Sequence, residues 1–206
     1  MRRKSVGTAL LCLAVVAVLV AACGEMKPSP GPSTSWTPGA SPVPAITYPP
    51  QDGTNTNFFA GTEGWYFKPT VDIEVTALGW YDDGQDGLTQ AHPVGIFDAS
   101  DEKLLVEAKV QPDSPLDGAF RWVSVEPPVA LKAGHEYVMA GYAGPPFDLA
   151  VKNPKDASFA PELRYLRYRI TTERNRVWGY PDAKDASTLL DTNFKFRPVS
   201  VASPTP

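Results

Sequence analysis

One short stretch of the chain places three carboxylates beside glycines. The three residues are Asp82, Asp83 and Asp86. Calcium ions prefer oxygen ligands, and glycine permits the tight turns that bring such ligands together. The stretch departs from the EF-hand pattern, because Gly84 stands where that loop needs an acid or amide and Pro93 stands where it needs a glutamate. It therefore predicts either a calcium site, completed by an acid such as Asp98 or Asp117, or a solvent-exposed turn in which Asp and Gly tolerate left-handed backbone geometry.

A second candidate site combines arginines with aromatic residues between positions 164 and 180. Its members are Arg164, Tyr165, Arg167, Tyr168, Arg169, Trp178 and Tyr180. Aromatic faces beside forked guanidinium donors suit the binding of sugar rings, or of anionic polymers such as wall phosphates and uronates. The same composition fits a structural role, in which the rings lie in the core and the arginine stems cover it. Strict strand alternation predicts two faces, one with Arg164, Leu166, Tyr168 and Ile170 and the other with Tyr165, Arg167 and Arg169.

Catalytic patterns are weak in this sequence. The two histidines, His92 and His135, have neither the spacing of a metal-binding pair nor a neighbouring serine motif, so we expect both to be structural. The carboxylate pair of a glycoside hydrolase cannot be recognised from spacing, because its members meet only in the folded chain. We therefore expect a protein that is not an enzyme and that has no cofactor other than the calcium ion considered above.

The N-terminus has the features of an export signal. Residues 1–22 begin with a basic stretch and continue with an apolar run that ends in small residues. Cys23 follows, and the junction resembles the lipobox of bacterial lipoproteins, in which the cysteine thiol receives a diacylglyceryl group and becomes the N-terminus after cleavage. Two acyl chains suffice for stable attachment. The resemblance implies a protein anchored by lipid to the cell membrane on its extracytoplasmic face; the alternative is ordinary secretion with Cys23 as a free thiol.

Composition divides the rest of the chain into a linker, one domain and a tail. Residues 23–50 and 198–206 are rich in proline, serine and threonine, which favours extended, unpacked chain. Residues 51–197 are numerous enough to bury a core without disulfides. The chain has 19 Lys and Arg residues against 23 Asp and Glu residues, a net charge of −4. We therefore expect no nucleic-acid partner, and contact with the membrane through the lipid anchor.

The domain segment predicts an all-β fold. Apolar and polar residues alternate in 73–80 and 120–125, which is the period of a half-buried strand. Similar short runs occur at 64–67, 94–97, 104–110, 135–142, 164–170 and 189–196. Turn-forming residues separate the runs, and neither strand–helix alternation nor an internal repeat is visible. We predict an antiparallel β-sandwich of about eight or nine strands, with a jelly-roll or immunoglobulin-like arrangement.

Several motifs of this segment resemble those of a known family. They are GWYF at 64–67, VTALGWYDDGQDGL at 75–88, HPVGIFD at 92–98, GAFRW at 118–122, AGHEY at 133–137, and the closing GY at 179–180 with NFKF at 193–196. They resemble a β-sandwich domain of unknown function that recurs in exported bacterial proteins, many of which carry the PEP-CTERM sorting signal. The resemblance implies an exported sandwich without an established catalytic set. This chain has a lipobox in place of a C-terminal sorting helix, so exopolysaccharide-linked sorting is not implied.

These features together predict a lipid-anchored, extracytoplasmic β-sandwich that binds a cell-envelope glycan or polymer without changing it. The first alternative is a structural or protein-docking module whose partner is another envelope protein. A hydrolase is a further alternative, which two facing carboxylates in a cleft would favour.

Overall fold

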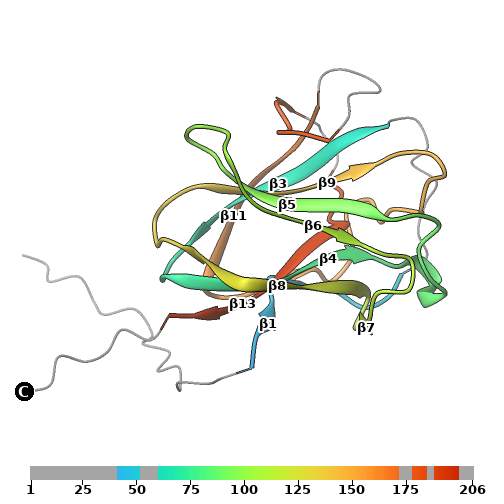
Figure 1. Ribbon diagram of the computed structural model, residues 1–206, viewed down its shortest axis with the longest axis horizontal. Helices are drawn as coiled ribbons and strands as arrows, with labels where there is room; N and C mark the ends of the chain where they lie inside the picture. Colours follow the sequence, from blue (N-terminus) through green and yellow to red (C-terminus); the bar gives the residue numbers. More distant parts are fainter. Residues whose placement is uncertain (1–40, 52–59, 172–177, 185–187, 200–206) are drawn as a thin grey trace, which may run out of the picture. The chain divides into compact units, whose positions relative to one another are not determined.

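The regular secondary structure of the described part of the chain is almost entirely strand, and every strand pair in it is antiparallel (Figure 1). The computed structural model describes residues 41–51, 60–171, 178–184 and 188–199. The predicted signal peptide, Cys23 and the first part of the predicted linker lie outside these ranges. In the described residues, no helix has the length and apolar character needed to cross a membrane.

Two main sheets and one two-stranded pair make up the described fold. The strands of the larger sheet are β3 (Gly61–Pro69), β5 (His92–Asp98), β6 (Leu104–Val110), β9 (Tyr137–Ala143), β11 (Leu163–Ile170) and β12 (Ala183–Lys184). Their order across the sheet is β12-β11-β3-β9-β5-β6. The strands of the smaller sheet are β1 (Val43–Pro44), β4 (Ile73–Tyr81), β7 (Leu116–Asp117), β8 (Phe120–Leu131) and β13 (Thr192–Pro198). Their order is β1-β13-β4-β8-β7, and a separate pair joins β2 (Ile46–Thr47) to β10 (Ser158–Phe159).

The predicted antiparallel β-sandwich is confirmed. Eight strands of the described chain have seven or more residues, and each of them overlaps one of the eight runs found by alternation. The remaining strands have two residues each. A pair of residues is too short to show a period, which is why the sequence did not reveal them.

The core lies between the two sheets and is rich in aromatic rings. Trp65 and Phe67 of β3 point inward and contact Phe194 of β13, with ring centroids 5.8 and 4.8 Å apart. Trp80 of β4 stacks on His92 of β5, with centroids 4.0 Å apart. Because full burial of a large apolar side chain contributes about 1.5–3 kcal/mol, these contacts across the layers hold the two sheets face to face.

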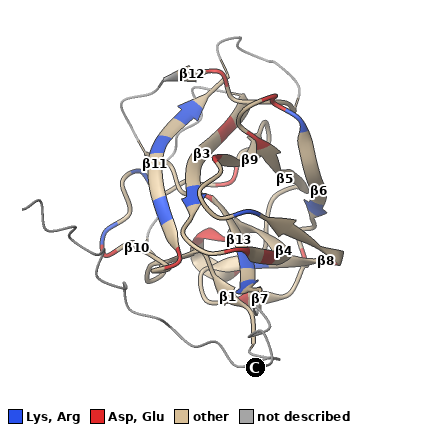
Figure 2. Cartoon of the chain, turned by 90° about the vertical axis from the view of Figure 1, so that its left-hand side faces the viewer, with Lys and Arg blue, Asp and Glu red and all other residues tan. Residues whose placement is uncertain are grey.

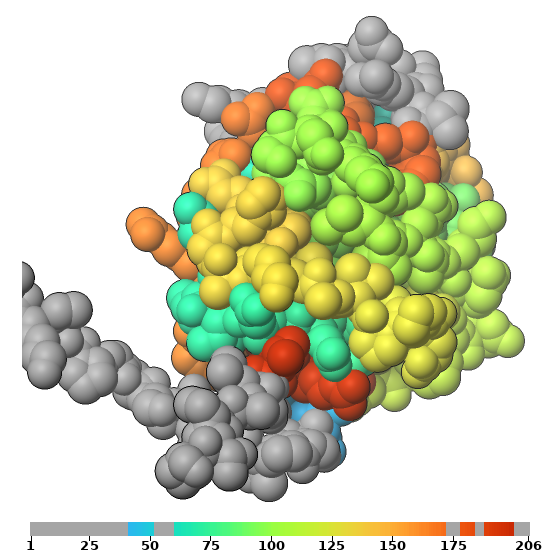
Figure 3. All heavy atoms as spheres, turned by 60° about the vertical axis from the view of Figure 1, so that its left-hand side comes forward, coloured from blue at the N-terminus to red at the C-terminus, as the bar shows by residue number. Residues whose placement is uncertain are grey.

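At one side the two sheets curl together. β6, at the edge of the larger sheet, contacts β8 of the smaller sheet. The light green surface of β6 and the yellow surface of β8 adjoin in the space-filling view (Figure 3). The sandwich is therefore closed at this side, and the outward faces of its two sheets are the broad surfaces on which side chains can meet a ligand.

The folded part begins before residue 51, where the sequence analysis placed its start. Residues 43–47 form β1 and β2, and Ala45, Ile46 and Tyr48 are buried. The side-chain amide of Asn193 accepts the backbone N–H of Ile46 at 3.1 Å and donates to its carbonyl oxygen at 2.8 Å. Because this stretch is rich in proline, the sequence analysis assigned it to the linker. Its apolar residues pack against the sandwich, and this packing orders the backbone of β1 and β2.

Candidate functional site

The basic and aromatic segment forms β11 and part of the chain after it. A β-bulge between Tyr165 and Arg167 shifts the register of β11 against β3. Tyr165 points inward, with its ring 5.0 Å from that of Phe159, and Tyr168 also points inward and donates its hydroxyl to Glu63 at 2.9 Å. The two faces predicted by strict alternation were wrong, because a bulge places two consecutive residues on one side of the strand.

Four of the seven predicted binding residues meet on the outer face of the larger sheet. With Tyr66 of β3 they form the basic-aromatic cluster: Tyr66, Arg167, Arg169, Trp178 and Tyr180. The guanidinium carbon of Arg167 lies 3.9 Å from the centroid of the Tyr66 ring, and that of Arg169 lies 5.4 Å from it. The hydroxyls of Tyr66 and Tyr180 are hydrogen-bonded at 2.6 Å. Trp178 and Tyr180 both pack on Phe97 of β5, so the rings and guanidinium groups form one connected array.

The cluster lies in a basic part of the surface. Arg164 is exposed on β11 and pairs in register with Lys68 of β3. Figure 2 shows blue segments recurring along β11. Glu136 is shared by Lys68 at 3.5 Å and Arg167 at 3.3 Å. Because one carboxylate serves two cations here, positive charge is left in excess over this part of the sheet.

Packing fixes the two arginines of the cluster. Arg169 donates to the backbone carbonyl of Asp182 at 3.0 Å. The Nε atoms of both Arg167 and Arg169 are buried and have no hydrogen-bond partner among the described residues. Burial and the hydrogen bond to Tyr180 raise the pKa of Tyr66 well above its usual value, so the phenol between the guanidinium groups stays neutral. Arg167 nevertheless keeps 38% of its side chain exposed.

The three aspartates of the acidic loop do not converge. Asp82 points into the protein, and its Oδ2 pairs with the Nε of Arg121 at 2.7 Å. Asp83 opens a short 3₁₀ turn, and Asp86 is exposed just after that turn. Across the described ranges, no group of three or more His, Cys, Asp or Glu side chains is arranged to hold a metal ion. The two glycines of the loop have φ angles of 71° and 110°, so the residue types are accounted for by the turn itself.

The acids considered as additional calcium ligands have other side-chain partners in the fold. Asp98 pairs with His135 at 2.8 Å, and Asp117 pairs with Lys195 at 2.6 Å. The hydrogen bonds from Ser100 and His135 outweigh the opposing effect of burial and lower the pKa of Asp98 to about 2. The ring of His135 is therefore held by Asp98.

Sequence reasoning missed the buried partner of His92. The Nε2 atom of His92 lies 2.6 Å from a carboxylate oxygen of Asp148, and its Nδ1 lies 3.0 Å from the carbonyl oxygen of Tyr142. The backbone N–H and the hydroxyl of Thr89 also donate to Asp148, at 2.7 and 2.9 Å. These residues come from separate parts of the chain, and the one sequence signal was a polar residue at the start of an apolar strand.

A buried carboxyl pair lies close to Asp148. Glu63 and Asp191 hydrogen-bond to each other through their side chains, and both are almost fully buried. Burial and the neighbouring charge of Glu63 raise the pKa of Asp191 well above its usual value. Glycoside hydrolases hold their two carboxyl groups about 5 Å or more apart. A directly hydrogen-bonded pair is closer than that, so Glu63 and Asp191 do not have the glycoside-hydrolase geometry.

Comparisons with known proteins bear on the domain rather than on a reaction. No curated protein and no solved structure matches the chain. One family model matches part of the chain, residues 50–150. This part begins before β3 and ends after β9, so it includes the acidic loop and leaves out β11 and β13. Residues 50–150 match the family model described as Domain of unknown function (DUF4082).

Proposed function

We propose that this β-sandwich binds an anionic glycan or other anionic polymer of the cell envelope, without changing it, through the basic-aromatic cluster. One observation carries the proposal: the guanidinium groups of Arg167 and Arg169 are held against the ring of Tyr66 on a chain whose net charge is −4. Cations that are already ordered lose little side-chain freedom when a ligand binds.

The chemistry of the cluster fits phosphates and carboxylates. A guanidinium group presents parallel N–H donors that match both kinds of oxyanion. Trp178 and Tyr180 lie beside the arginines with partly exposed rings, which can contact the apolar face of a sugar. The basic surface continues to Lys68 and Arg164, so successive charges of a polymer would find successive cations along β3 and β11.

The proposal includes the location predicted from the sequence. A lipid on Cys23 would hold the chain at the outer surface of the membrane, and the residues between 23 and the first strand would act as a spacer. A domain held there would meet envelope polymers at high local concentration. A modest affinity for each charged group would then be enough to keep the polymer bound.

The test is retention of the full chain on immobilised polymers. We expect it to be retained on a polyuronate and on a poly(glycerol phosphate), to pass through neutral dextran, and to elute as salt screens the charges. Arg167→Gln combined with Arg169→Gln should lower retention about tenfold or more, because each lost charged hydrogen bond contributes about 1.5–3 kcal/mol. Arg197→Gln is the matched control, since Arg197 is similarly exposed but pairs with Glu74 on the other sheet.

The outcomes separate the proposal from its alternatives. Retention that is unchanged in the double variant, or that is equal on dextran, would contradict binding through the cluster. Failure to bind any polymer, together with discrete protein adducts after crosslinking in cells, would favour the docking module instead. Release of smaller products from a retained polymer would contradict the non-catalytic part of the proposal.

A further inference from the structure

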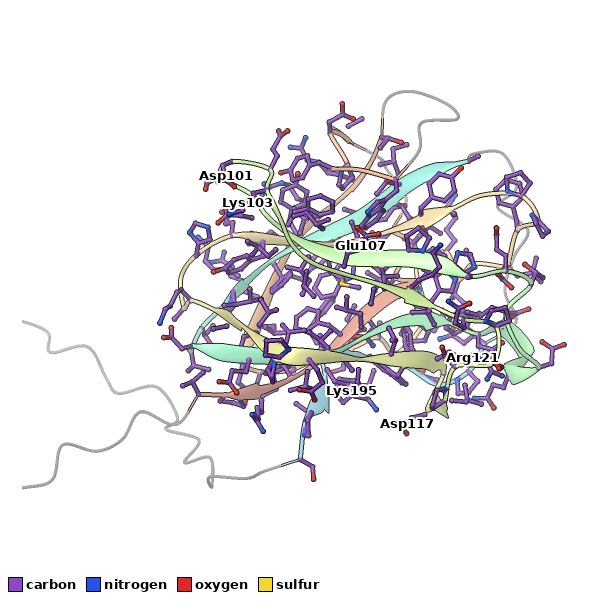
Figure 4. The ribbon with its side chains drawn as sticks, in the orientation of Figure 1. Asp101, Lys103, Glu107, Asp117, Arg121 and Lys195 are labelled. Atoms are coloured by element: carbon purple, nitrogen blue, oxygen red, sulfur yellow. The ribbon has the colours of Figure 1, made fainter. Side chains whose placement is uncertain are left out.

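A pocket of about 120 Å³ lies beside the smaller sheet, on the side away from the larger one. It opens between the chain segment around β2 and the hairpin of β7 and β8; Figure 4 labels Asp117 and Lys195 in this region. The side chains that define it are those of Ile46, Tyr48, Asp117, Phe120, Trp122 and Lys195. None of them belongs to the basic-aromatic cluster, so the two sites are separate.

The position of Trp122 follows from the pleat of the smaller sheet. Trp80 points inward, because it stacks on His92 of the other sheet, and its neighbour Gly79 therefore faces outward. Gly79 and Trp122 are partners in register, and a Cβ at position 79 would lie 2.7 Å from the indole ring. The missing side chain allows the indole to lie close to the sheet. Its Nε1 donates to the carbonyl oxygen of Asp117 at 3.0 Å, which fixes the ring.

The rim of the pocket carries a donor and an acceptor side by side. The ammonium of Lys195 lies 2.6 Å from a carboxylate oxygen of Asp117 and 4.5 Å from the centroid of the Trp122 ring. The side chain of Asp117 is 73% exposed, whereas that of Lys195 is 20% exposed. The carboxylate is thus open to solvent, and the ammonium is held beside the aromatic wall.

We propose that this pocket binds a single neutral pyranose ring that carries adjacent hydroxyl groups. An enclosed cavity of about 150 Å³ holds one benzene molecule, so a pocket of about 120 Å³ that opens to solvent takes in part of one sugar ring rather than a chain. The C–H groups of the sugar contact the apolar lining of the pocket. One hydroxyl accepts from Lys195 while the next donates to Asp117, as a vicinal diol does.

The charge of the rim selects the sugar. The carboxylate of Asp117 is far more exposed than the ammonium of Lys195, so an approaching uronate or sugar phosphate meets the negative group first and is disfavoured, whereas a hydroxyl is a good donor to it. A hydrocarbon ring would contact the apolar walls of the pocket but would make no hydrogen bond with Asp117 or Lys195 at its rim. The neutral sugar therefore distinguishes this pocket from the cluster proposed to bind anionic polymer.

The test is ligand-observed saturation-transfer NMR on the full chain, in a detergent without a sugar headgroup. The probes are glucose, galactose, mannose and N-acetylglucosamine, with glucuronate and indole as the charged and the aromatic comparison. We expect at least one neutral sugar to give a saturable signal, and glucuronate and indole to bind about tenfold more weakly or worse. Circular dichroism on each variant confirms that it is folded.

Two variants with a matched control assign the signal to the pocket. Asp117→Asn with Lys195→Met should weaken sugar binding about tenfold, because both rim partners are lost. Thr47→Phe should abolish it, because residue 47 lines the pocket and its exposed side chain can fill the opening. Asp72→Asn with Lys132→Met removes another exposed ion pair, of 2.8 Å, and should leave binding unchanged.

Three results would overturn the proposal. The first is the absence of a saturable signal from every neutral sugar. The second is sugar binding that persists in the folded Thr47→Phe chain. The third is stronger binding of indole or glucuronate than of the neutral sugars. The polymer-retention variants at Arg167 and Arg169 should not affect this signal, so failure here is distinguishable from failure of the proposed function.

Discussion

His92 shows how one buried side chain joins the two sheets. Its ring stacks on Trp80, and its two nitrogens face the carbonyl oxygen of Tyr142 and the carboxylate of Asp148. Burial opposes ionisation of Asp148, but the hydrogen bonds from His92 and Thr89 outweigh burial and lower its pKa. His92 therefore ties β5 both to the backbone of β9 and to the buried carboxylate of Asp148.

Replacing His92 by phenylalanine keeps a stacking ring but removes the partner of Asp148. We expect the free energy of unfolding to fall by about 2–4 kcal/mol, because a buried carboxylate is left uncompensated. Asp148→Asn in the same chain should restore part of the loss. Urea unfolding of the two single variants and the double variant measures both effects.

The matched control for this prediction is His135→Phe. The side chain of His135 is 39% exposed beside Asp98, and exposed pairs contribute less than about 1 kcal/mol. Equal losses at the two histidines would contradict a stabilising role for the buried contact between His92 and Asp148.

Asp191 should make the folded state less stable as the pH rises. Burial and Glu63 raise its pKa in the folded state, whereas in the unfolded chain the carboxyl loses its proton near its ordinary pKa of about 3.9. Between these two values the folded state binds more protons, so the free energy of unfolding falls with increasing pH. Asp191→Asn stays neutral and should flatten that fall, as urea midpoints between pH 5 and pH 8 would show. Asp117→Asn, at an exposed carboxylate, is the control and should leave the pH dependence unchanged. If Asp191→Asn also leaves it unchanged, the pH dependence does not come from Asp191.

The residue types at the candidate site were visible in the sequence, but their partners were not. Arg167 and Arg169 were recognised by composition, whereas Tyr66, on which they lie, belongs to a distant strand. Asp82 appeared to be one of three equivalent acids, and only the fold shows that it turns inward to Arg121. Composition identifies the groups available for chemistry; pairing between distant strands decides which of them meet.

At the scale of the elements, alternation and turn residues located the eight long strands. They did not predict the bulge in β11 or the shortest strands. The bulge in β11 replaces strict alternation with two consecutive outward residues, Leu166 and Arg167. No local propensity marks that position, because the bulge depends on the register of β11 against β3. The short β1 and β2 were also missed, since their proline-rich surroundings resembled the linker.

Asn193 is the residue that ties the first strands to the sandwich. Its amide satisfies the N–H and the carbonyl of Ile46 and also accepts the N–H of Phe194. Asn193→Ala leaves these buried groups without partners, so we expect a loss of about 2–4 kcal/mol in the free energy of unfolding. Limited proteolysis should also cleave within residues 41–51 sooner than in the unaltered chain.

Thr76→Ala is the control for Asn193, because it removes a single, partly buried hydrogen bond to the carbonyl of Lys195. We expect a smaller loss and no change in cleavage of residues 41–51. If the Asn193→Ala chain were as stable and as resistant as this control, the segment would not depend on the amide.

At the scale of the whole molecule, the two outer faces of the sandwich carry different chemistry. The larger sheet presents guanidinium groups beside aromatic rings, and the smaller sheet presents a pocket with a lysine and an aspartate at its rim. If both proposals hold, one domain contacts anionic and neutral parts of the same envelope material. Two weak contacts on one ligand would then give an avidity that exceeds either affinity.

The lipid anchor is a property of the whole chain that can be separated from its fold. The described core begins with β1, well after Cys23. Cys23→Ala should therefore abolish labelling by a fatty-acid probe and release the protein from the membrane, because the thiol is the predicted acyl acceptor. The thermal unfolding midpoint of the domain should stay the same. Labelling that persists in the variant would disprove the lipobox interpretation, whereas loss of both labelling and folding would show that the N-terminal segment contributes to the core.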